Sequence, residues 1–274
     1  MKTDHSEIVW LASYPKSGNT WMRFFLTCLL QGPPETSADI LDCIPEIGSG
    51  SPKKVYEKEG RVIVKTHLLY SDQLPLKDRT VGMIYILRNP LDLALSAFNY
   101  HMLQLAEDQT IPQPESVYMR NYINNFINRG GADRTWLDLG YGSWYSHLQS
   151  WYGEAARHHP HLFIRYEDML ETPYLVGQTI ASFLNLDITE TQMKQALEYS
   201  SFENMKAMEE REIHLEKETF FNRENSVGGG LQRGKRFMNK GKSNRQHDIP
   251  LQLRKNICHA FGAPMKQFGY LPSK

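Results

Sequence analysis

The chain has 274 residues, with 31 Lys and Arg residues against 31 Asp and Glu residues. This balance gives no sign of a surface for nucleic acid, and the apolar stretch at residues 24–30 is too short to cross a membrane. The length suits a single α/β domain over residues 1–274, and the widely spaced Cys28, Cys43 and Cys258 predict reduced thiols in a cytoplasmic protein without a metal site.

The hydrophobic pattern predicts strands that alternate with helices. Strands are expected at residues 7–12, 61–66, 80–87 and 161–166. Helices are expected at residues 19–31, 90–104, 116–128, 143–156, 174–184, 189–199, 203–212 and 250–261. Residues 35–60 contain frequent Pro, Gly and Ser and are expected to be mostly loop. The alternation predicts an open parallel sheet with helices on both faces, in which ligands bind beyond the carboxyl ends of the strands.

A short polar segment joins the first expected strand to the first helix. Residues 13–21 read Ser-Tyr-Pro-Lys-Ser-Gly-Asn-Thr-Trp. Small Ser17 and Gly18 let backbone N–H groups approach a ligand, and the N-terminus of the following helix attracts anions. Lys16 precedes the glycine, so the Walker A order is absent, and with it the hydroxyl that would hold Mg²⁺. The segment therefore predicts a P-loop-like phosphate loop that works without a metal ion.

The run from Tyr14 to Trp21 resembles the 5′-phosphosulfate loop of the sulfotransferases that use PAPS, 3′-phosphoadenosine 5′-phosphosulfate. The resemblance extends over about residues 8–245 and implies transfer of a sulfuryl group from PAPS to a hydroxyl of a small-molecule acceptor. The product would be adenosine 3′,5′-bisphosphate (PAP). The loop residues implied to bind the nucleotide are Lys16, Ser17, Gly18, Asn19, Thr20 and Trp21.

Arg88 follows the third expected strand, and its guanidinium suits bidentate binding of a phosphate. On the helix after it, Asn89, Asp92 and Ser96 are three, four and seven residues apart and share one face. This segment resembles the 3′-phosphate motif of the same family. The resemblance implies that Arg88 and Ser96 bind the 3′-phosphate and that Ser96 also restrains Lys16.

A histidine at the end of a strand can act as a general base, because its pKa lies near neutrality. His67 stands at the end of the second expected strand, and Lys65-Thr66-His67-Leu68 resembles the family segment that holds the catalytic base. The resemblance implies that His67 takes the acceptor proton and that Lys65 assists. Lys16 would then stabilise the charge on the leaving phosphate.

Three later residues complete the implied nucleotide site. Tyr166 would contact the adenine, Ser200 would form a hydrogen bond, and Phe202 would stack on the base opposite Trp21. These roles come from the resemblance alone.

The last family motif is incomplete in this chain. Of its Arg-Lys-Gly-x-x-Gly pattern and following tryptophan, the sequence keeps Lys240 and Gly241, with Asn239 in place of the arginine. Residues 231–245 contain six basic and no acidic residues, which predicts a basic lid loop. The glycines at residues 228–230 and the ending at residues 266–270 are similar to those of bacterial sulfotransferases that modify glycopeptide antibiotics.

Two other functions remain open at this point. A P-loop nucleotide kinase or NTPase would share the strand, loop and helix, although the order of lysine and Ser/Thr differs. A catalytically decayed nucleotide-binding protein would explain Asn239 and the missing tryptophan. The sequence also leaves four classes of acceptor possible: a phenol, an alcohol, a sugar or a peptide tyrosine. It does not predict the oligomeric state.

Overall fold

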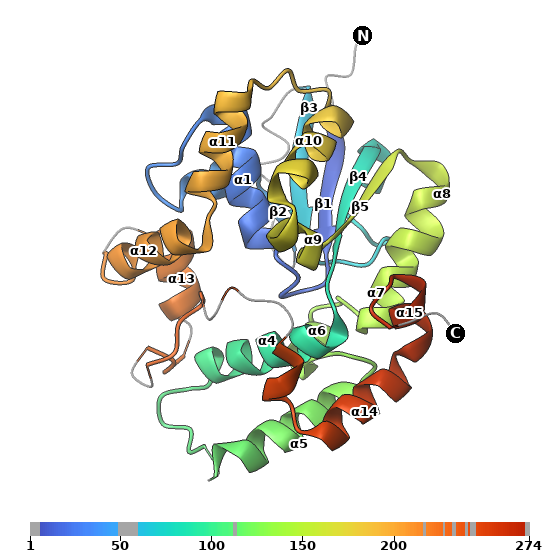
Figure 1. Ribbon diagram of the computed structural model, residues 1–274, viewed down its shortest axis with the longest axis vertical. Coiled ribbons are helices and arrows are strands. Elements are labelled where there is room, and N and C mark those ends of the chain that lie inside the picture. The colour runs from blue at the N-terminus through green and yellow to red at the C-terminus, as the bar shows by residue number, and fades with distance from the viewer. Residues whose placement is uncertain are drawn as a thin grey trace.

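The structure is a computed structural model that describes residues 6–48, 60–111, 114–215, 218–226, 228–231, 234–238, 241 and 245–271. Its five strands form one sheet in the order β2-β3-β1-β4-β5, and every neighbouring pair is parallel. The strands are β1 (Glu7–Ser13), β2 (Glu46–Ile47), β3 (Arg61–Thr66), β4 (Thr80–Leu87) and β5 (His161–Arg165). This arrangement confirms the predicted open parallel sheet (Figure 1).

The centre of the sheet is buried on both faces. In β1, Trp10 and Ala12 belong to one core, whereas Val9 and Leu11 belong to the other. Side chains of a strand alternate between the faces of its sheet, so a strand covered on both sides needs an unbroken apolar run. The sequences of β1 and β4 meet this requirement, which is why both strands were predictable.

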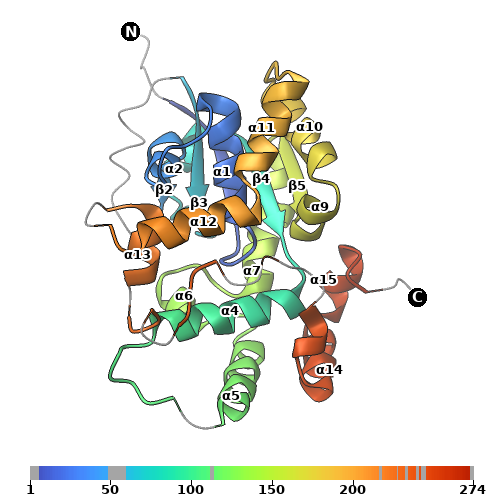
Figure 2. The same cartoon turned by 60° about the vertical axis from the view of Figure 1, so that its left-hand side comes forward.

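Helices cover both faces, as predicted (Figures 1 and 2). Beside Val9 and Leu11 lie α1 (Asn19–Gln31), α9 (Tyr166–Glu171), α10 (Pro173–Leu184) and α11 (Glu190–Tyr199). Beside Trp10 and Ala12 lie α4 (Pro90–Gln104), α5 (Glu115–Asn128), α6 (Arg134–Asp138), α7 (Trp144–Leu148), the π-helical turn η2 (Gln149–Ala155) and α14 (Leu251–Ala260). The views place α4, α5 and α14 beyond the carboxyl ends of the strands.

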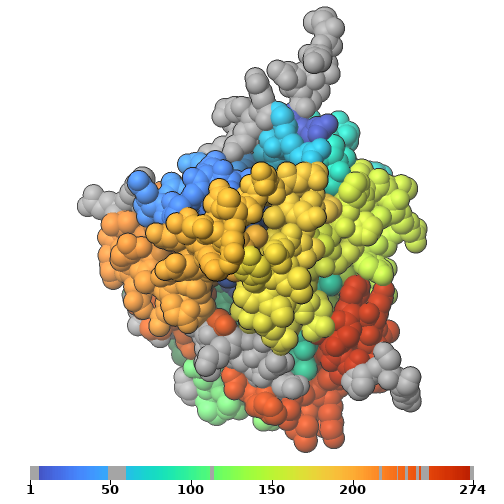
Figure 3. Space-filling model, turned by 45° about the horizontal axis from the view of Figure 1, so that its top comes forward, coloured from blue at the N-terminus to red at the C-terminus, as the bar shows by residue number. Residues whose placement is uncertain are grey.

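The remaining helices are short or lie at the edges. They are α2 (Asp39–Cys43), η1 (Lys77–Arg79), α8 (Ala156–His158), α12 (Phe202–Glu212), α13 (Phe220–Ser226), η3 (Arg245–Asp248) and α15 (Gly262–Gln267). Helices α9 to α12, coloured yellow to orange, form much of the surface in Figure 3. No helix within the described part of the chain has both the length and the apolar character needed to cross a membrane.

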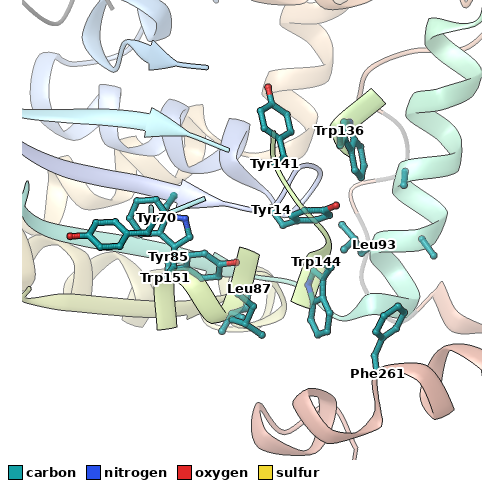
Figure 4. Close-up of a cluster of buried hydrophobic side chains, with 14 of the residues drawn as sticks. Tyr14, Tyr70, Tyr85, Leu87, Leu93, Trp136, Tyr141, Trp144, Trp151 and Phe261 are labelled. Atoms are coloured by element: carbon teal, nitrogen blue, oxygen red, sulfur yellow. The ribbon is translucent and has the colours of Figure 1, made fainter. Parts of the chain in front are cut away.

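Aromatic side chains fasten the phosphate loop to the core (Figure 4). The Tyr14 hydroxyl donates to the carbonyl of Gly142 at 3.0 Å, and the Tyr14 ring meets the Trp136 ring edge-on with centroids 5.6 Å apart. Edge-on aromatic pairs are favourable beyond the area they bury. The position of the loop is therefore set by residues more than a hundred positions away along the chain.

The structure differs from the sequence prediction mainly at short elements. Residues 35–60 were expected to be mostly loop, yet α2 and β2 lie there, and α6 was not expected either. The last strand ends at Arg165, and Tyr166 begins α9. Strand β2 is only two residues long, so it carries no periodic signal. Its backbone forms a strand because Glu46 and Ile47 pair with β3.

Candidate active site

A cavity of about 360 Å³ lies at the carboxyl ends of the strands, between the sheet and helices α4, α12 and α13. Its lining brings together residues that follow three different strands, namely Lys16, His67 and Arg88. The position agrees with the rule that parallel sheets bind ligands at this edge.

The phosphate loop has the backbone shape of an anion cradle. Lys16 and Gly18 adopt φ angles of 65° and 99°, in the left-handed region. Gly18 is the N-cap of α1 and offers no side chain to the free N–H groups of the first turn. A Cβ atom at Gly18 would lie 2.5 Å from Tyr166 Cδ2, so only glycine fits. The buried Ser17 Oγ has no hydrogen-bond partner among the described residues, which leaves it free for a phosphate.

Arg88 connects the phosphate loop to the helices beyond β4. Its Nη1 donates to the carbonyl of Lys16 at 2.6 Å, and its guanidinium lies 4.1 Å above the centre of the Tyr166 ring. No described residue accepts a hydrogen bond from the buried Arg88 Nε. Ser96, two turns into α4, lines the same cavity. The Arg88 guanidinium can therefore hold the phosphate loop and still donate a hydrogen bond to a ligand.

The amine of Lys16 lies between two aromatic rings. Nζ is 3.8 Å from the centre of the Phe237 ring and 4.2 Å from that of Tyr100. Burial lowers the pKa of Lys16 to about 7, although the carboxylate of Glu224 acts in the opposite direction. The Tyr100 hydroxyl donates to Glu224 at 2.9 Å, which fixes the ring beneath the amine.

The orientation of His67 leaves one ring nitrogen available as a base. Nδ1 lies 2.6 Å from the carbonyl of Ser13, so Nδ1 carries the proton and donates it. Nε2 then keeps its lone pair. Burial, followed by the charge of Lys65, holds the pKa of His67 well below its usual value. The Tyr141 ring packs edge-on against the imidazole at 5.6 Å.

A group of charged side chains lies beside His67. Lys65 forms a short ion pair with Glu46, and Arg23 Nη1 lies 3.8 Å from the second oxygen of the same carboxylate. Burial alone would raise the pKa of Glu46, but Lys65 and Arg23 outweigh it and lower the pKa to about 2. Burial lowers the pKa of Arg23 to about 10. No described group of three or more His, Cys, Asp or Glu residues is arranged to hold a metal ion.

Comparison with known proteins agrees with this arrangement. A family model described as "Sulfotransferase domain" matches residues 6–269. The chain belongs to the sulfotransferase family. Two curated relatives are Sulfotransferase 1A1 of Rattus norvegicus, 31% identical, and Sulfotransferase 1B1 of Canis lupus familiaris, 27% identical. Each match covers 72% of this chain, and the chain spans 66% and 65% of the length of those relatives.

Solved structures share the fold. Mouse sulfotransferase SULT7A1 complexed with PAP has a TM-score of 0.65 and 22% identity, over 95% of this chain and 84% of that one. Retinol dehydratase in complex with androsterone and inactive cofactor PAP has a TM-score of 0.69 and 21% identity, over 94% of this chain and 80% of that one.

Most of the residues predicted for the site line one cavity of this sulfotransferase. They are Lys16, Gly18, Asn19, Thr20, Trp21, Lys65, His67, Arg88, Ser96, Tyr166, Phe202 and Gly241. Ser17 is buried within the loop and is not among the residues that line the cavity. Ser200, the residue after α11, is not among the residues that line the cavity; it is buried and donates its hydroxyl to the carbonyl of Ala196 at 2.7 Å. Lys240, together with Asn239, lies outside the described residues.

Sequence reasoning missed several side chains of the site. Glu46 lay in a segment expected to be loop, and Arg23 sits on the first helix without any motif. Tyr100 is one turn beyond Ser96 on the face of α4 that lines the cavity, so helical spacing could have found it. No local pattern places Phe237 over Lys16, because the contact joins residues more than two hundred positions apart.

Proposed function

We propose that this sulfotransferase moves a sulfuryl group from PAPS to a hydroxyl of a small-molecule acceptor and releases PAP. The observation that carries the proposal is the shared cavity of Arg88, Lys16 and His67 in a chain of this family. Two phosphate-binding groups and a base with a free Nε2 are what the reaction needs. PAP is present in the solved structure of mouse SULT7A1, which has this fold.

The residues fit the nucleotide by their chemistry. The start of α1, which has no side-chain cap, together with Ser17 Oγ and Arg88 Nε, which have no partner in the part of the chain that the structure describes, offers donors for phosphate oxygens. Tyr166 and Phe202 offer rings for a base. The Ser200 hydroxyl donates to the last turn of α11, so its proposed bond to the nucleotide needs a rotation of this hydroxyl. Lys240 and Gly241 are proposed to close over the nucleotide as part of the basic lid loop.

In the proposed reaction PAPS supplies the sulfuryl group. His67 Nε2 takes the proton of the acceptor hydroxyl as the acceptor oxygen bonds to sulfur. As the sulfur–oxygen bond to the 5′-phosphate breaks, Lys16 and the N–H groups of α1 stabilise the growing negative charge. Ser96, on the cavity wall, is proposed to restrain Lys16 until the acceptor arrives. Aromatic Trp136 and Tyr141 near the base suit a small acceptor with an apolar body.

We also infer that residues 1–274 act as one domain in the cytoplasm. The family model spans residues 6–269, and the cavity is lined by residues from Pro15 to Gly241, which supports a single unit. The likeness to enzymes that modify glycopeptide antibiotics stays a prediction. The family match gives no support to the kinase alternative.

Calorimetric titration with PAP, without Mg²⁺, tests the nucleotide. PAP is expected to bind at least about tenfold more tightly than 5′-AMP, because a second phosphate adds charge-assisted hydrogen bonds at Arg88. A preference for Mg²⁺·ATP would contradict the proposal and favour a kinase. Selective PAP binding without transfer from labelled PAPS to any phenol or alcohol would favour a decayed nucleotide-binding protein.

The variant His67→Asn tests the base. Transfer is expected to fall by about 10²- to 10⁴-fold, because the proposed acceptor of the hydroxyl proton is removed. The affinity for PAP is expected to change by less than about twofold, because PAP lacks the reacting sulfuryl group. Labelled transfer and calorimetry measure the two effects. Full activity in this variant would show that another residue is the base.

A further inference from the structure

The strand order spreads charged side chains along one edge of the sheet. The sheet order places β4, β1, β3 and β2 side by side, and each strand either contains or is followed by one charged residue of the cavity. In that order these residues are Arg88, Lys16, Lys65 and Glu46. Neighbouring strands lie about 4.8 Å apart. Lys65 is therefore the next cation along this edge for a ligand whose phosphates would occupy Arg88 and Lys16.

The parallel register fixes the last two of these charges against each other. Glu46 in β2 is the partner of Lys65 in β3, and their side chains form a short ion pair. The Lys65 side chain is only 7% exposed. Arg23 holds the other carboxylate oxygen and itself donates to the carbonyl of Ile44 at 2.6 Å. Both the backbone and Arg23 thus keep the carboxylate of Glu46 on the ammonium of Lys65.

The same carboxylate balances the charge around the base. The groups around His67 are the carbonyl of Ser13 after β1, Lys65 on β3, Glu46 on β2, Tyr141 before α7 and His147 in α7. The charge of Lys65 disfavours a protonated imidazole, and the charge of Glu46 favours it. Glu46 therefore contacts Lys65 directly and acts on His67 through its charge.

We propose that Glu46 is a positioning residue that competes with the sulfuryl group for Lys65. The inference rests on the proposed function. While Glu46 holds the ammonium, a bound sulfuryl group gains only part of the attraction that a free Lys65 would give. An attraction that is equally strong in the bound substrate and in the transition state does not speed the chemical step. Because Glu46 restrains Lys65 while the substrate is in its ground state, the attraction of Lys65 for the sulfuryl group is weaker there, which favours catalysis.

The variant Glu46→Gln tests the competition without an acceptor. PAPS carries the sulfuryl group and PAP lacks it, so the ratio of their affinities reports on Lys65. In this variant PAPS is expected to bind about tenfold more tightly, while the affinity for PAP changes by less than about twofold. Calorimetry with each nucleotide gives both values. General damage to the fold would weaken both nucleotides together.

Three further variants act as controls. Glu46→Asp keeps the charge and is expected to stay near the wild-type ratio. Glu190→Gln removes a carboxylate from an exposed pair with Lys194 on α11 and is expected to change neither affinity. In a Lys65→Met background, Glu46→Gln is expected to leave the PAPS-to-PAP ratio unaltered, because the competing cation is gone.

Each other result decides against the inference. Equal changes for PAPS and PAP, no change for either, or an effect that persists without Lys65 would overturn the role of Glu46 alone. Failure of the wild-type protein to bind either nucleotide would overturn the proposed function and this inference with it.

Discussion

Lys16 combines a positive charge with surroundings that disfavour it. The rings of Tyr100 and Phe237 enclose its amine, and burial lowers its pKa to about 7. A phosphate placed beside the amine would favour the charged form and raise the pKa again. Ligand binding and protonation of Lys16 are therefore linked.

PAP binding is expected to take up protons above neutral pH. Below pH 7 the amine is protonated both before and after binding, so its charge does not change. Above pH 7 the free protein has a mostly neutral amine, and binding takes up close to one proton. The affinity then falls as pH rises, by up to about tenfold per pH unit. Calorimetry in buffers of different ionisation enthalpy measures the uptake.

The variant Lys16→Met distinguishes the proton taken up by Lys16 from protons taken up by the phosphates of PAP. At pH 8, PAP binding to this variant is expected to take up nearly one proton fewer than PAP binding to the wild type. Equal uptake in the two proteins would show that Lys16 is not the linked group.

Single residues at strand ends were the most predictable part of the site. Lys16, His67 and Arg88 each follow an apolar strand, and the carboxyl ends of parallel strands meet at one edge. Glu46 and Phe237 were not predictable in this way. The position of Glu46 depends on strand register, and that of Phe237 depends on a contact between remote segments. Neither can be predicted from the neighbouring residues in the sequence.

At the scale of elements, a buried carboxylate of α12 holds two residues of the segment expected to form a lid. The backbone N–H groups of Phe237 and Met238 donate to Glu209 at 2.8 and 3.1 Å, and Asn225 Nδ2 donates to it at 2.7 Å. Glu209 is fully buried, so these charge-assisted bonds replace its hydration. The described lid segment, residues 234–238, thereby reaches Lys16 through the Phe237 ring.

The variant Glu209→Gln is expected to loosen this segment. An amide offers one oxygen where the carboxylate accepts with two, and its NH₂ group would face the backbone donors. Losing such bonds costs about 1.5–3 kcal/mol, so the amide hydrogens of Phe237 and Met238 should exchange about 10- to 100-fold faster. Hydrogen-exchange mass spectrometry measures the rates.

A matched control lies next to it on the same helix. Glu210 is exposed and pairs only loosely with Lys206, at 3.8 Å, so Glu210→Gln should leave the exchange unchanged. Similar exchange in the two variants would mean that other contacts hold the lid.

Long elements were predicted well, and short ones were not. Helix α4 begins as expected, with Asn89 capping the N–H of Leu91 at 3.0 Å and Pro90 in the first turn. The five-residue helices α2 and α6 and the two-residue strand β2 were missed. Such pieces are too short for a hydrophobic period, and tertiary contacts decide their shape.

For the whole molecule, the cavity joins segments that are remote along the chain. Its lining runs from Pro15 to Gly241 and includes residues of the sheet and of α4, α12 and α13. A ligand in it binds only the folded chain. The fold class was predictable from alternating strands and helices, whereas the strand order was not, because it depends on which remote strands pair.

PAP is therefore expected to stabilise the protein as a unit. At a hundred times its dissociation constant, PAP should raise the free energy of unfolding by about 2.7 kcal/mol. Urea unfolding followed by tryptophan fluorescence and by far-UV circular dichroism should shift by the same amount. At the same concentration 5′-AMP should shift the transition less. Stabilisation seen by only one of the two probes would show that PAP protects only part of the structure.

The central position of β1 has a consequence for how this chain is made. β1 comes first among the strands in the sequence, yet its two neighbours are β3 and β4, which end at Thr66 and Leu87. During synthesis β1 and the loop after it must wait, unpaired and strongly apolar, for those strands to emerge, and β5 follows only at His161. Parallel pairing across long intervals is slow and exposes such strands to aggregation. The phosphate loop that follows β1 thus leaves the ribosome before the two strands that hold β1 in the sheet.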